Sequence, residues 1–571
     1  MSFGAALAYR AEEMPDEAAF MLVEHGQDDR IMTFLELHRR AQDVAALLLE
    51  KMPVAGRALL LFPPGLDYVC ALYGCFQAGI IAVSAPPPQP NRLHRTLPRL
   101  EAIATDAEIS AVLTADFIRE AAESFFKEGP LTEVQWIATD TAPEHGEAEV
   151  ARPDLSEMAF LQYTSGSTRD PRGVVLSHAN LMDNSNLITD ALGHIPNGLR
   201  KGLSWLPPYH DMGLIAGVLQ PVHAGGLCIM MSPLSVIKKP ARWLEAMSKY
   251  RVTTSGGPNF AYDLCVRRVD EETCERIDLS DWEVAFNGAE PIRAETIEAF
   301  CEKFGPCGFR RDAFQTGYGL AEATLMVTSG DKEKVPTLLE VDARALEGGM
   351  VRRSTGEGPT KTLVGSGMTF EGSKLAIVDP DEGRLCEEGE VGEIWFSGPG
   401  VAFGYWRNPD ETAEVFGAKH PDDPDATYLR TGDLGALVDG ELYVVGRIKE
   451  LIILNGRNVH PHDIEFSAEE ASPLLRSHCS AAFEQEVDGE IRIAIALEVD
   501  STDDEDDYGQ VMAAVRKRVA DDLDLPLYWI GLCARGTVPK TTSGKIQRRL
   551  FKAMLADGDI ELLAENPPRE S

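Results

Sequence analysis

Short apolar runs alternate with helical patterns in the first part of the chain. An apolar run at 58–62 is followed by a Pro-Pro-Gly turn at 63–65, a helical stretch that ends at Gly79, and a second apolar run at 80–83. This strand, helix, strand order is typical of a parallel sheet covered by helices. The proline-rich segment 85–92 predicts a rigid surface connector, because it suits neither a helix nor a central strand.

The same pattern predicts the organisation of the whole chain. Further strands are expected at 111–114, 134–138, 159–163, 202–206, 227–231 and 284–287. Short strands at 374–378, 393–397 and 436–445 predict a β-rich subdomain at about 370–447. A hairpin around 488–489 and a helix at 508–522 predict a small C-terminal α+β unit, and the acidic run 503–507 predicts a solvated loop.

We therefore predict an α/β protein with a large N-terminal region of helix-covered sheets at 1–447. A small mobile α+β C-terminal domain would follow at 448–571.

Composition narrows the function. The chain has 571 residues and a formal net charge of -37. A polyanion repels phosphate backbones, so nucleic acid is not an expected partner. The ten cysteines form no Cys-x-x-Cys pair and indicate reduced thiols. No signal peptide and no apolar stretch of about 20 residues is evident, which predicts a soluble, cytoplasmic protein without a membrane span.

Residues 162–173 (QYTSGSTRDPRG) follow one of the strand candidates. Their hydroxyl side chains and glycines would offer O–H and backbone N–H donors to a polyphosphate. No Gly-Lys-Ser/Thr closes the loop, so it is not a Walker A loop. From spacing alone, a phosphate loop and a Ser/Thr-rich surface turn are equally good interpretations.

Five motifs then occur in order: YTSGST with PRG (163–173), GYGLAE (317–322), YLRTGD (428–433), GRIKE (446–450) and PKTTSGK (539–545). This series, over nearly the whole chain, resembles the adenylate-forming superfamily of acyl-CoA synthetases, luciferases and peptide-synthetase adenylation domains. The resemblance implies ATP and Mg²⁺ as cofactors and an acyl adenylate as product.

A finer resemblance is to the fatty acyl-AMP ligases. It rests on segments 160–178, 206–217, 255–268, 287–292, 318–325 and 455–465. The chain also carries a long stretch between Thr324 and Gly365 where the superfamily needs far fewer residues. This stretch resembles the insertion, at about 330–364, that these ligases place beside the C-terminal domain. In the family it limits the rotation that CoA transfer requires.

The resemblance also implies roles for individual residues. Lys545 would bridge the carboxylate and the α-phosphate, His210 would lie near the carboxylate, Glu322 would bind Mg²⁺, and Lys449 would be the hinge. The expected ATP or adenylate contacts are Thr164, Ser165, Gly166, Ser167, Thr168, Arg172, Asn287, Gly288, Ala289, Tyr318, Gly319, Leu320, Asp433 and Arg447. Among these, Tyr318 would stack on adenine, and Asp433 with Arg447 would bind the ribose.

Plainer interpretations exist for these residues. Lys545 and Lys449 could be solvated lysines, and Glu322 could cap a helix. Tyr318 and His210 could belong to the core. Asp433 and Arg447, taken alone, could form a surface ion pair of little stabilising value.

Two further features refine the prediction. His460 and His462 suggest metal ligands, but no third ligand is evident, and we reject a zinc site. Arg169 and Arg172 stand where many superfamily members have Gly and Lys, and Ala321 stands where many have Thr. Arginine still supplies charge and donors, so these changes are interpreted as marks of the subfamily.

The expected acyl pocket is formed by Gly256, Gly257 and Phe260 in SGGPNFAYD. Amino-acid adenylation domains place an Asp there to pair the α-ammonium group of their substrate. Since no acid precedes Phe260 here, an apolar carboxylic acid fits better.

The predicted reaction is ATP-dependent activation of a fatty acid to an acyl adenylate with release of pyrophosphate. The acyl group would then pass to the phosphopantetheine thiol of an acyl carrier protein. The basic segment of Lys540, Arg548, Arg549 and Lys552 could receive this carrier, bind phosphate or simply be solvated. The alternatives are a fatty acyl-CoA synthetase and a non-catalytic adenylate-binding protein.

Overall fold

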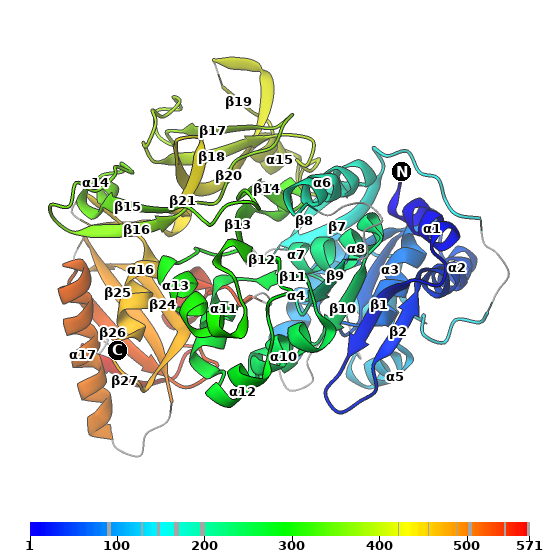
Figure 1. The fold of residues 1–571 in the computed structure, drawn as a ribbon, viewed down its shortest axis with the longest axis horizontal. Coiled ribbons are helices and arrows are strands. Elements are labelled where there is room, and N and C mark those ends of the chain that lie inside the picture. Colours follow the sequence, from blue (N-terminus) through cyan, green and yellow to red (C-terminus); the bar gives the residue numbers. More distant parts are fainter. Residues whose placement is uncertain are drawn as a thin grey trace.

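A computed structural model describes most of the chain (Figure 1). The described residues are 1–87, 93–126, 129–144, 149–164, 171–193, 200–420, 422–454, 456–487, 489–500, 505–541 and 544–567. The proposed phosphate-loop residues Ser165, Gly166, Ser167 and Thr168 lie outside them, as does most of the connector 85–92. No helix in the described ranges is long and apolar enough to cross a bilayer.

The first sheet has the strand order β6-β5-β3-β4-β7-β8. Its strands are β3 (Arg57–Leu61), β4 (Ile81–Ser84), β5 (Ala111–Thr114), β6 (Gln135–Ala138), β7 (Met158–Thr164) and β8 (Arg172–Ser177). Helix α3 (Leu66–Ala78) crosses from β3 to the parallel strand β4 and ends at Gly79, whose φ of 66° is left-handed. The predicted strand, helix, strand unit is therefore confirmed.

The second sheet has the order β14-β13-β12-β11-β9-β10-β1-β2. Its strands are β1 (Ala18–Val23), β2 (Arg30–Thr33), β9 (Lys201–Ser204), β10 (Leu227–Met231), β11 (Thr254–Gly257), β12 (Val284–Asn287), β13 (Phe314–Gly319) and β14 (Met326–Ser329). The five central strands, from β13 to β10, run parallel, so their carboxyl ends meet at one edge. That edge positions the tips of β12 and β13 for the site described below.

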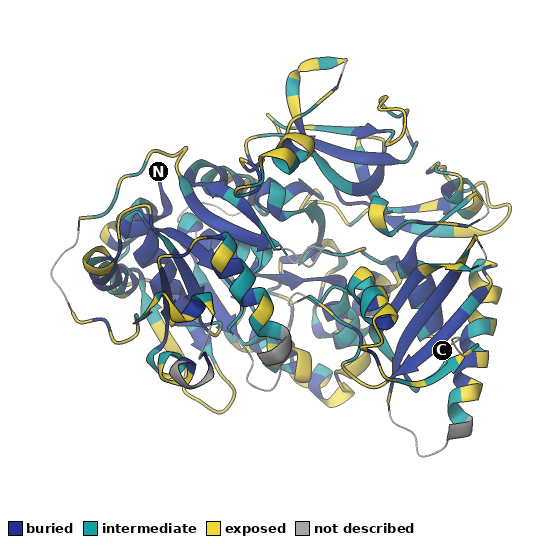
Figure 2. Cartoon of the chain, turned by 180° about the vertical axis from the view of Figure 1, so that it is seen from behind, coloured by how far each residue is buried: buried dark blue, intermediate teal, exposed yellow. Residues whose placement is uncertain are grey.

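Helices cover the two sheets, and the strands are the most deeply buried elements (Figure 2). The helices are α1 (Phe3–Glu13), α2 (Phe34–Lys51), α4 (Leu93–Asp106), α5 (Asp116–Phe125), α6 (His178–Ala191), α7 (Asp211–Leu214), η3 (Ile215–Leu219), α8 (Gln220–Ala224), α9 (Pro233–Lys238), α10 (Ala241–Tyr250), α11 (Asn259–Arg268), α12 (Glu271–Arg276) and α13 (Ala294–Phe304). Against the second sheet, the rings of Trp243, Tyr262, Trp282 and Phe300 pack with centroids 5.2–6.4 Å apart. This aromatic cluster anchors β11 and β12.

A third, β-rich sheet follows, as the pattern after residue 370 predicted. Its strands are β17 (Lys374–Val378), β18 (Gly392–Ser397), β19 (Ala418–His420), β20 (Asp423–Val438) and β21 (Glu441–Arg447), with α15 (Pro409–Phe416) beside them. Strands β20 and β21 turn at Asp439 and Gly440, which both have positive φ, as a tight hairpin requires. The predicted hairpin is therefore present, although β20 begins well before residue 436.

The C-terminal elements build a separate four-stranded sheet of order β24-β25-β26-β27. They comprise β22 (Ile452–Leu454), β23 (Arg457–Val459), α16 (Pro461–Glu469), β24 (Leu475–Val487), β25 (Glu490–Val499), α17 (Glu505–Leu523), β26 (Leu527–Cys533), α18 (Arg548–Ala556) and β27 (Leu562–Asn566). The predicted loop at 503–507 is wrong for residues 505–507, which begin α17, and residues 503 and 504 lie outside the described ranges. Acidic residues suit a helix N-terminus, whose partial positive charge attracts them.

The stretch that resembles an insertion folds as β15 (Leu338–Asp342), α14 (Ala343–Glu347) and β16 (Thr360–Val364). Figure 1 places it between the β-rich sheet and the C-terminal elements. Two ion pairs join it to the latter. Glu347 receives two hydrogen bonds of 2.8 and 2.9 Å from Arg457, and Lys361 lies 2.6 Å from an oxygen of Asp463. We call these two ion pairs the insertion clamp.

Candidate active site

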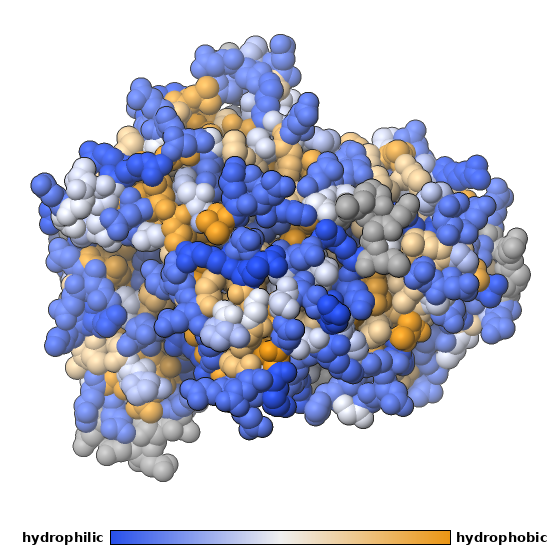
Figure 3. All heavy atoms as spheres, in the orientation of Figure 1, coloured by the Kyte–Doolittle hydropathy of each residue, from blue (hydrophilic) through white to orange (hydrophobic). Residues whose placement is uncertain are grey.

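A cavity of about 1620 Å³, here called the main cavity, lies where the second sheet, the β-rich sheet and the C-terminal elements meet. Seen from the side of Figure 1, hydrophilic side chains cover most of the molecule, with smaller hydrophobic groups between them (Figure 3). The predicted site residues that line the main cavity are Thr164, Arg172, His210, Phe260, Asn287, Gly288, Ala289, Tyr318, Gly319, Leu320, Glu322, Asp433, Arg447, Lys449 and Lys545. The structure thus brings together residues separated by almost 400 positions.

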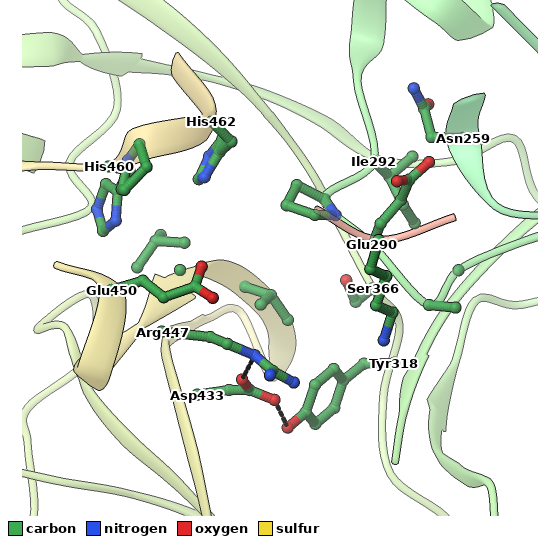
Figure 4. A pocket seen from close by; sticks show the side chains of 18 of the residues that line it. Asn259, Glu290, Ile292, Tyr318, Ser366, Asp433, Arg447, Glu450, His460 and His462 are labelled. Atoms are coloured by element: carbon green, nitrogen blue, oxygen red, sulfur yellow. Dashed lines mark hydrogen bonds and ion pairs between the residues drawn. The ribbon is translucent and has the colours of Figure 1, made fainter. Parts of the chain in front are cut away.

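Tyr318, Asp433 and Arg447 form a chain of polar contacts on one wall (Figure 4). Asp433 and Arg447 are direct partners in the ladder of β20 and β21. The Arg447 Nε atom lies 2.8 Å from Asp433 Oδ1, and the Tyr318 hydroxyl donates to Asp433 Oδ2 at 2.7 Å. Burial, together with the Asp433 charge, raises the pKa of Tyr318 well above its ordinary value. The phenol therefore stays protonated and can hold the carboxylate in place.

The carboxyl end of β12 lies beside Tyr318, because β12 pairs with β13. A Cβ atom added at Gly288 would lie 2.9 Å from the carbonyl oxygen of Gly317, so the two backbones approach closely there. The side-chain oxygen of buried Asn287 has no hydrogen-bond partner among the described residues. A buried polar atom without a partner is costly, and a ligand donor would satisfy it.

Glu322 lies in the short helix η6 (Ala321–Ala323) and accepts a hydrogen bond of 2.9 Å from the Tyr405 hydroxyl. The guanidinium of Arg172 stands over the Tyr405 ring at 5.6 Å and pairs with Glu411 at 2.6 Å. Burial raises the pKa of Glu322. A buried carboxylate of this kind gains most from a nearby cation, because a cation offsets the cost of its desolvation.

Lys545 reaches the same cavity from the loop before α18, where its backbone N–H donates to the Thr541 hydroxyl at 3.0 Å. Burial lowers the pKa of Lys545, and the positive charge of Arg447 lowers it further, whereas Asp211 and Asp433 act in the opposite direction. The C-terminal lysine thus shares one electrostatic environment with residues of the second and β-rich sheets.

Burial lowers the pKa of His210 to about 3, and the charges of Lys545 and Arg99 contribute. The imidazole is therefore neutral near pH 7. It can orient a carboxylate through a hydrogen bond, but it adds no positive charge.

Comparison with known proteins identifies the family of this chain. Residues 7–406 match the sequence model of the AMP-binding enzyme family. The medium-chain-fatty-acid–[acyl-carrier-protein] ligase JamA of Moorena producens is 41% identical, with 97% of this chain and 95% of JamA covered. The chain belongs to the AMP-binding enzyme family.

Two further comparisons place it among the fatty acyl-AMP ligases of that family. A long-chain-fatty-acid–AMP ligase of Mycolicibacterium smegmatis is 34% identical, with 93% of this chain and 90% of the relative covered. The fatty acyl-adenylate ligase of L. pneumophila, solved in complex with acyl adenylate and pyrophosphate, is 37% identical, with a TM-score of 0.76 over 99% of this chain and 97% of that one. This AMP-binding enzyme is an adenylate-forming ligase, and its nucleotide substrate is ATP.

Two predicted acyl-pocket residues do not line the main cavity of this ligase. A Cβ atom at Gly256 would lie 2.6 Å from the ring of Phe286, and one at Gly257 would lie 2.6 Å from the ring of Trp205. These glycines give room to aromatic side chains. Phe260 does line the cavity; its backbone N–H donates to Glu290 Oε1 at 2.6 Å, and its ring lies 6.3 Å from that of His478.

His460 and His462, at which the sequence analysis rejected a zinc site, also line the main cavity. The two rings stack at 5.6 Å on the wall formed by the C-terminal elements. Burial is the main cause that lowers the pKa of His460, to about 4. Among the described residues, no group of three or more His, Cys, Asp or Glu side chains is arranged to hold a metal ion.

Sequence reasoning did not single out several residues that shape the site of this AMP-binding enzyme. Asp211 and Glu290 lie inside motifs that were quoted, directly beside His210 and Ala289, and could have been found there. Tyr405 and Glu411 belong to no such motif. Their part in the site follows only from the packing of segment 400–416 beside Glu322 and Arg172.

Proposed function

We propose that this ligase activates a medium-chain fatty acid as its acyl adenylate and transfers the acyl group to a carrier-protein thiol. The observation that carries the proposal is the convergence of Lys545 with the Tyr318, Asp433 and Arg447 wall in one cavity. The names of the relatives, which specify fatty acids and an acyl carrier protein, support the substrate and the acceptor.

Each wall has a part in the first step. Asp433 would accept hydrogen bonds from the ribose hydroxyls, held by Arg447, and Tyr318 would stack on adenine beside Asn287. Two anions, the carboxylate and ATP, must meet at the α-phosphorus. Lys545 would neutralise the charge that develops there as the carboxylate oxygen forms a bond to phosphorus and pyrophosphate leaves. Neutral His210 would orient the carboxylate.

Mg²⁺ belongs to this proposal as well. Glu322 fits the cation because it lines the cavity, is partly buried and offers the hard oxygen ligand that Mg²⁺ prefers. When bound, the cation would neutralise phosphate charge. Tyr405 would hold Glu322 in its orientation through the 2.9 Å hydrogen bond.

The choice of acceptor is proposed from the boundary between the large region and the C-terminal domain. Lys449 would be the hinge at the start of residues 448–571, and it is exposed directly after β21. The insertion clamp ties the C-terminal elements to the insertion at Arg457 and Asp463. Such ties oppose the domain rotation that CoA transfer would need, so a carrier protein is the favoured acceptor.

The basic segment of Lys540, Arg548, Arg549 and Lys552, one interpretation of which is carrier docking, exposes less positive charge than its sequence suggests. The Arg548 side chain is only 16% exposed, and it donates hydrogen bonds to Glu465 at 2.7 Å and to Glu450 at 2.6 Å. Its charge is therefore neutralised inside the C-terminal domain. Lys552 remains half-exposed near Glu484. A carrier protein would meet fewer basic groups than the sequence suggested.

The test measures pyrophosphate release with ATP, Mg²⁺ and decanoic acid, and then identifies the product formed with CoA or with a holo acyl carrier protein. We expect acid-dependent release, acyl transfer to the carrier, and a loss of about a hundredfold or more in Lys545→Ala, as for removal of one key electrostatic group. Lys552→Ala is the matched control, because it removes a lysine from the same segment outside the main cavity.

Three outcomes would contradict the proposal. Unchanged turnover in Lys545→Ala would remove the role of the lysine. Abundant acyl-CoA would identify a fatty acyl-CoA synthetase. The absence of release with any acid would identify a non-catalytic adenylate-binding protein.

A further inference from the structure

A second, smaller cavity lies between the second sheet and the helical segment from η3 to α8. Its volume is about 60 Å³, and we call it the inner chamber. Among the residues that line it are Leu203, Leu227 and Cys228 from the strands and Pro221 and Ala224 from α8. It borders the amino-terminal ends of β9 and β10, where Arg200 and Gly226 also line it, and the site described above does not account for it.

Two residues line both the main cavity and the inner chamber: Phe286 on β12 and Ala216 on η3. Both are only partly buried, although each stands between buried neighbours. Partial exposure inside the protein identifies them as facing the empty space. The ring of Phe286 on one side and the methyl group of Ala216 on the other therefore separate the two volumes.

Close packing fixes the positions of Phe286 and Ala216. Gly256 pairs with Phe286 across β11 and β12, and a Cβ atom at Gly256 would meet Cγ of Phe286 at 2.6 Å, so the ring lies over the glycine. On the other side, a Cβ atom at Gly217 would lie 2.6 Å from the Ser204 hydroxyl oxygen. Gly217, next to Ala216, therefore packs against Ser204 of β9 at a distance that only a glycine permits.

The helical segment from α7 to α8 also runs between the inner chamber and the place near His210 where the fatty-acid carboxylate would bind. His210 and Asp211 stand at its start, Met212 and Ala216 line the main cavity, and Ala216 and Gln220 line the chamber. From Met212 to Gln220 the chain stays helical, and the middle of this segment, η3, is a π-helix. An apolar chain whose carboxylate lies near His210 could follow this path until it reaches the ring of Phe286.

We propose that Phe286, with Ala216 opposite, sets the length of the fatty acid by closing the inner chamber to the end of the acyl chain. This inference rests on the proposed function. Acids that end before the ring bind in the main cavity, and longer acids are disfavoured because the ring occupies their path. The two residues are specificity determinants, and they take no part in the transfer of the phosphoryl group.

The experiment measures kcat/KM for pyrophosphate release with straight-chain acids from hexanoic to octadecanoic acid. Phe286→Ala joins the two volumes, and the preferred acid is expected to become longer. Each additional buried methylene is worth about fourfold in kcat/KM, so acids two methylenes longer should gain about tenfold or more relative to the wild-type optimum. Ala216→Leu adds apolar bulk beside the ring at the end of the acyl path in the main cavity, and it should reduce use of the longest accepted acids while short acids are unaffected.

Phe286→Leu and Phe309→Leu form a matched pair, because Phe309 is a buried ring of the same aromatic core that lines neither cavity. Only the first should change the length profile, and thermal melting reports whether each variant folds. An unchanged profile in folded Phe286→Ala would overturn the inference. Should that variant not fold, Ala216→Leu decides, because a uniform loss over all acids would equally overturn it. Failure of the proposed function is distinguishable, since wild-type enzyme would then use no acid of any length.

Discussion

Removal of the insertion clamp offers a quantitative test of how the acceptor is chosen. The perturbation is the double variant Glu347→Ala with Lys361→Ala, which deletes one partner from each ion pair. All four side chains are about a third exposed, between 27% and 31%. Exposed pairs contribute about 0–1 kcal/mol, whereas breaking a buried pair costs about 3–5 kcal/mol. We therefore expect each ion pair to stabilise the docked C-terminal domain by about 1–2 kcal/mol.

The two pairs together would stabilise the docked C-terminal domain by about 2–4 kcal/mol. Since about 1.4 kcal/mol is a factor of ten, their loss should favour release about thirtyfold or more. If the clamp limits CoA transfer, the double variant should form acyl-CoA at least about tenfold faster than wild type. Pyrophosphate release without an acceptor should stay within a few-fold.

The assay separates acyl-CoA by chromatography after incubation with decanoic acid, ATP and CoA. Lys374→Ala serves as the control, because it breaks an ion pair with Asp423 in the β-rich sheet, away from the insertion. The reasoning is refuted if the double variant releases pyrophosphate normally and yet forms no more acyl-CoA than wild type.

Two further predictions concern Asp433, which we propose binds the ribose of ATP, and stability in acid. Asp433→Asn should raise the KM for ATP about tenfold or more, because charged hydrogen bonds contribute about 1.5–3 kcal/mol. Asp423→Asn, on the same strand, is the control and should leave the KM for ATP unchanged. Equal KM values for Asp433→Asn and wild type would contradict the assignment of Asp433 to the ribose. Burial lowers the pKa of both His178 and His460 to about 4. Below pH 6.5 the unfolded chain therefore binds more protons than the folded one, and stability should fall between about pH 6.5 and 4 by up to about 1.4 kcal/mol per histidine for each pH unit. Urea unfolding at pH 7, 6 and 5 measures this slope, which His178→Asn should reduce and which a flat profile would refute.

Continuous apolar runs predicted the buried strands well. The strands at 111–114, 227–231, 284–287 and 374–378 have the predicted bounds. The first three lie in the helix-covered sheets, where a strand covered on both faces needs no polar positions. Strand β11 was not predicted, since Thr-Ser-Gly-Gly has little β propensity. Its glycines are explained only by the rings of Phe286 and Trp205 that lie against them.

The sequence predicted only part of the site, because motifs identify residues but not their contacts. Motifs identified Tyr318, Asp433 and Lys545 individually, but their order along the chain carries no information about which of them touch. The contact of Tyr405 with Glu322 joins segments that no motif connects. The division of the apolar space by Phe286 depends on a ring position that a sequence pattern does not encode.

The electrostatics around Lys545 bear on the role that we propose for it in adenylation. Inside the main cavity, burial and Arg447 both lower the pKa of Lys545, and only carboxylates of the large region, such as Asp211 and Asp433, oppose this effect. The ammonium group is thus least well solvated when the C-terminal domain is docked and no ligand is bound. Two substrate anions would replace the lost hydration, so they would stabilise the docked domain as well as the charge on Lys545. The conformation that carries out adenylation is then the one that the substrates themselves favour.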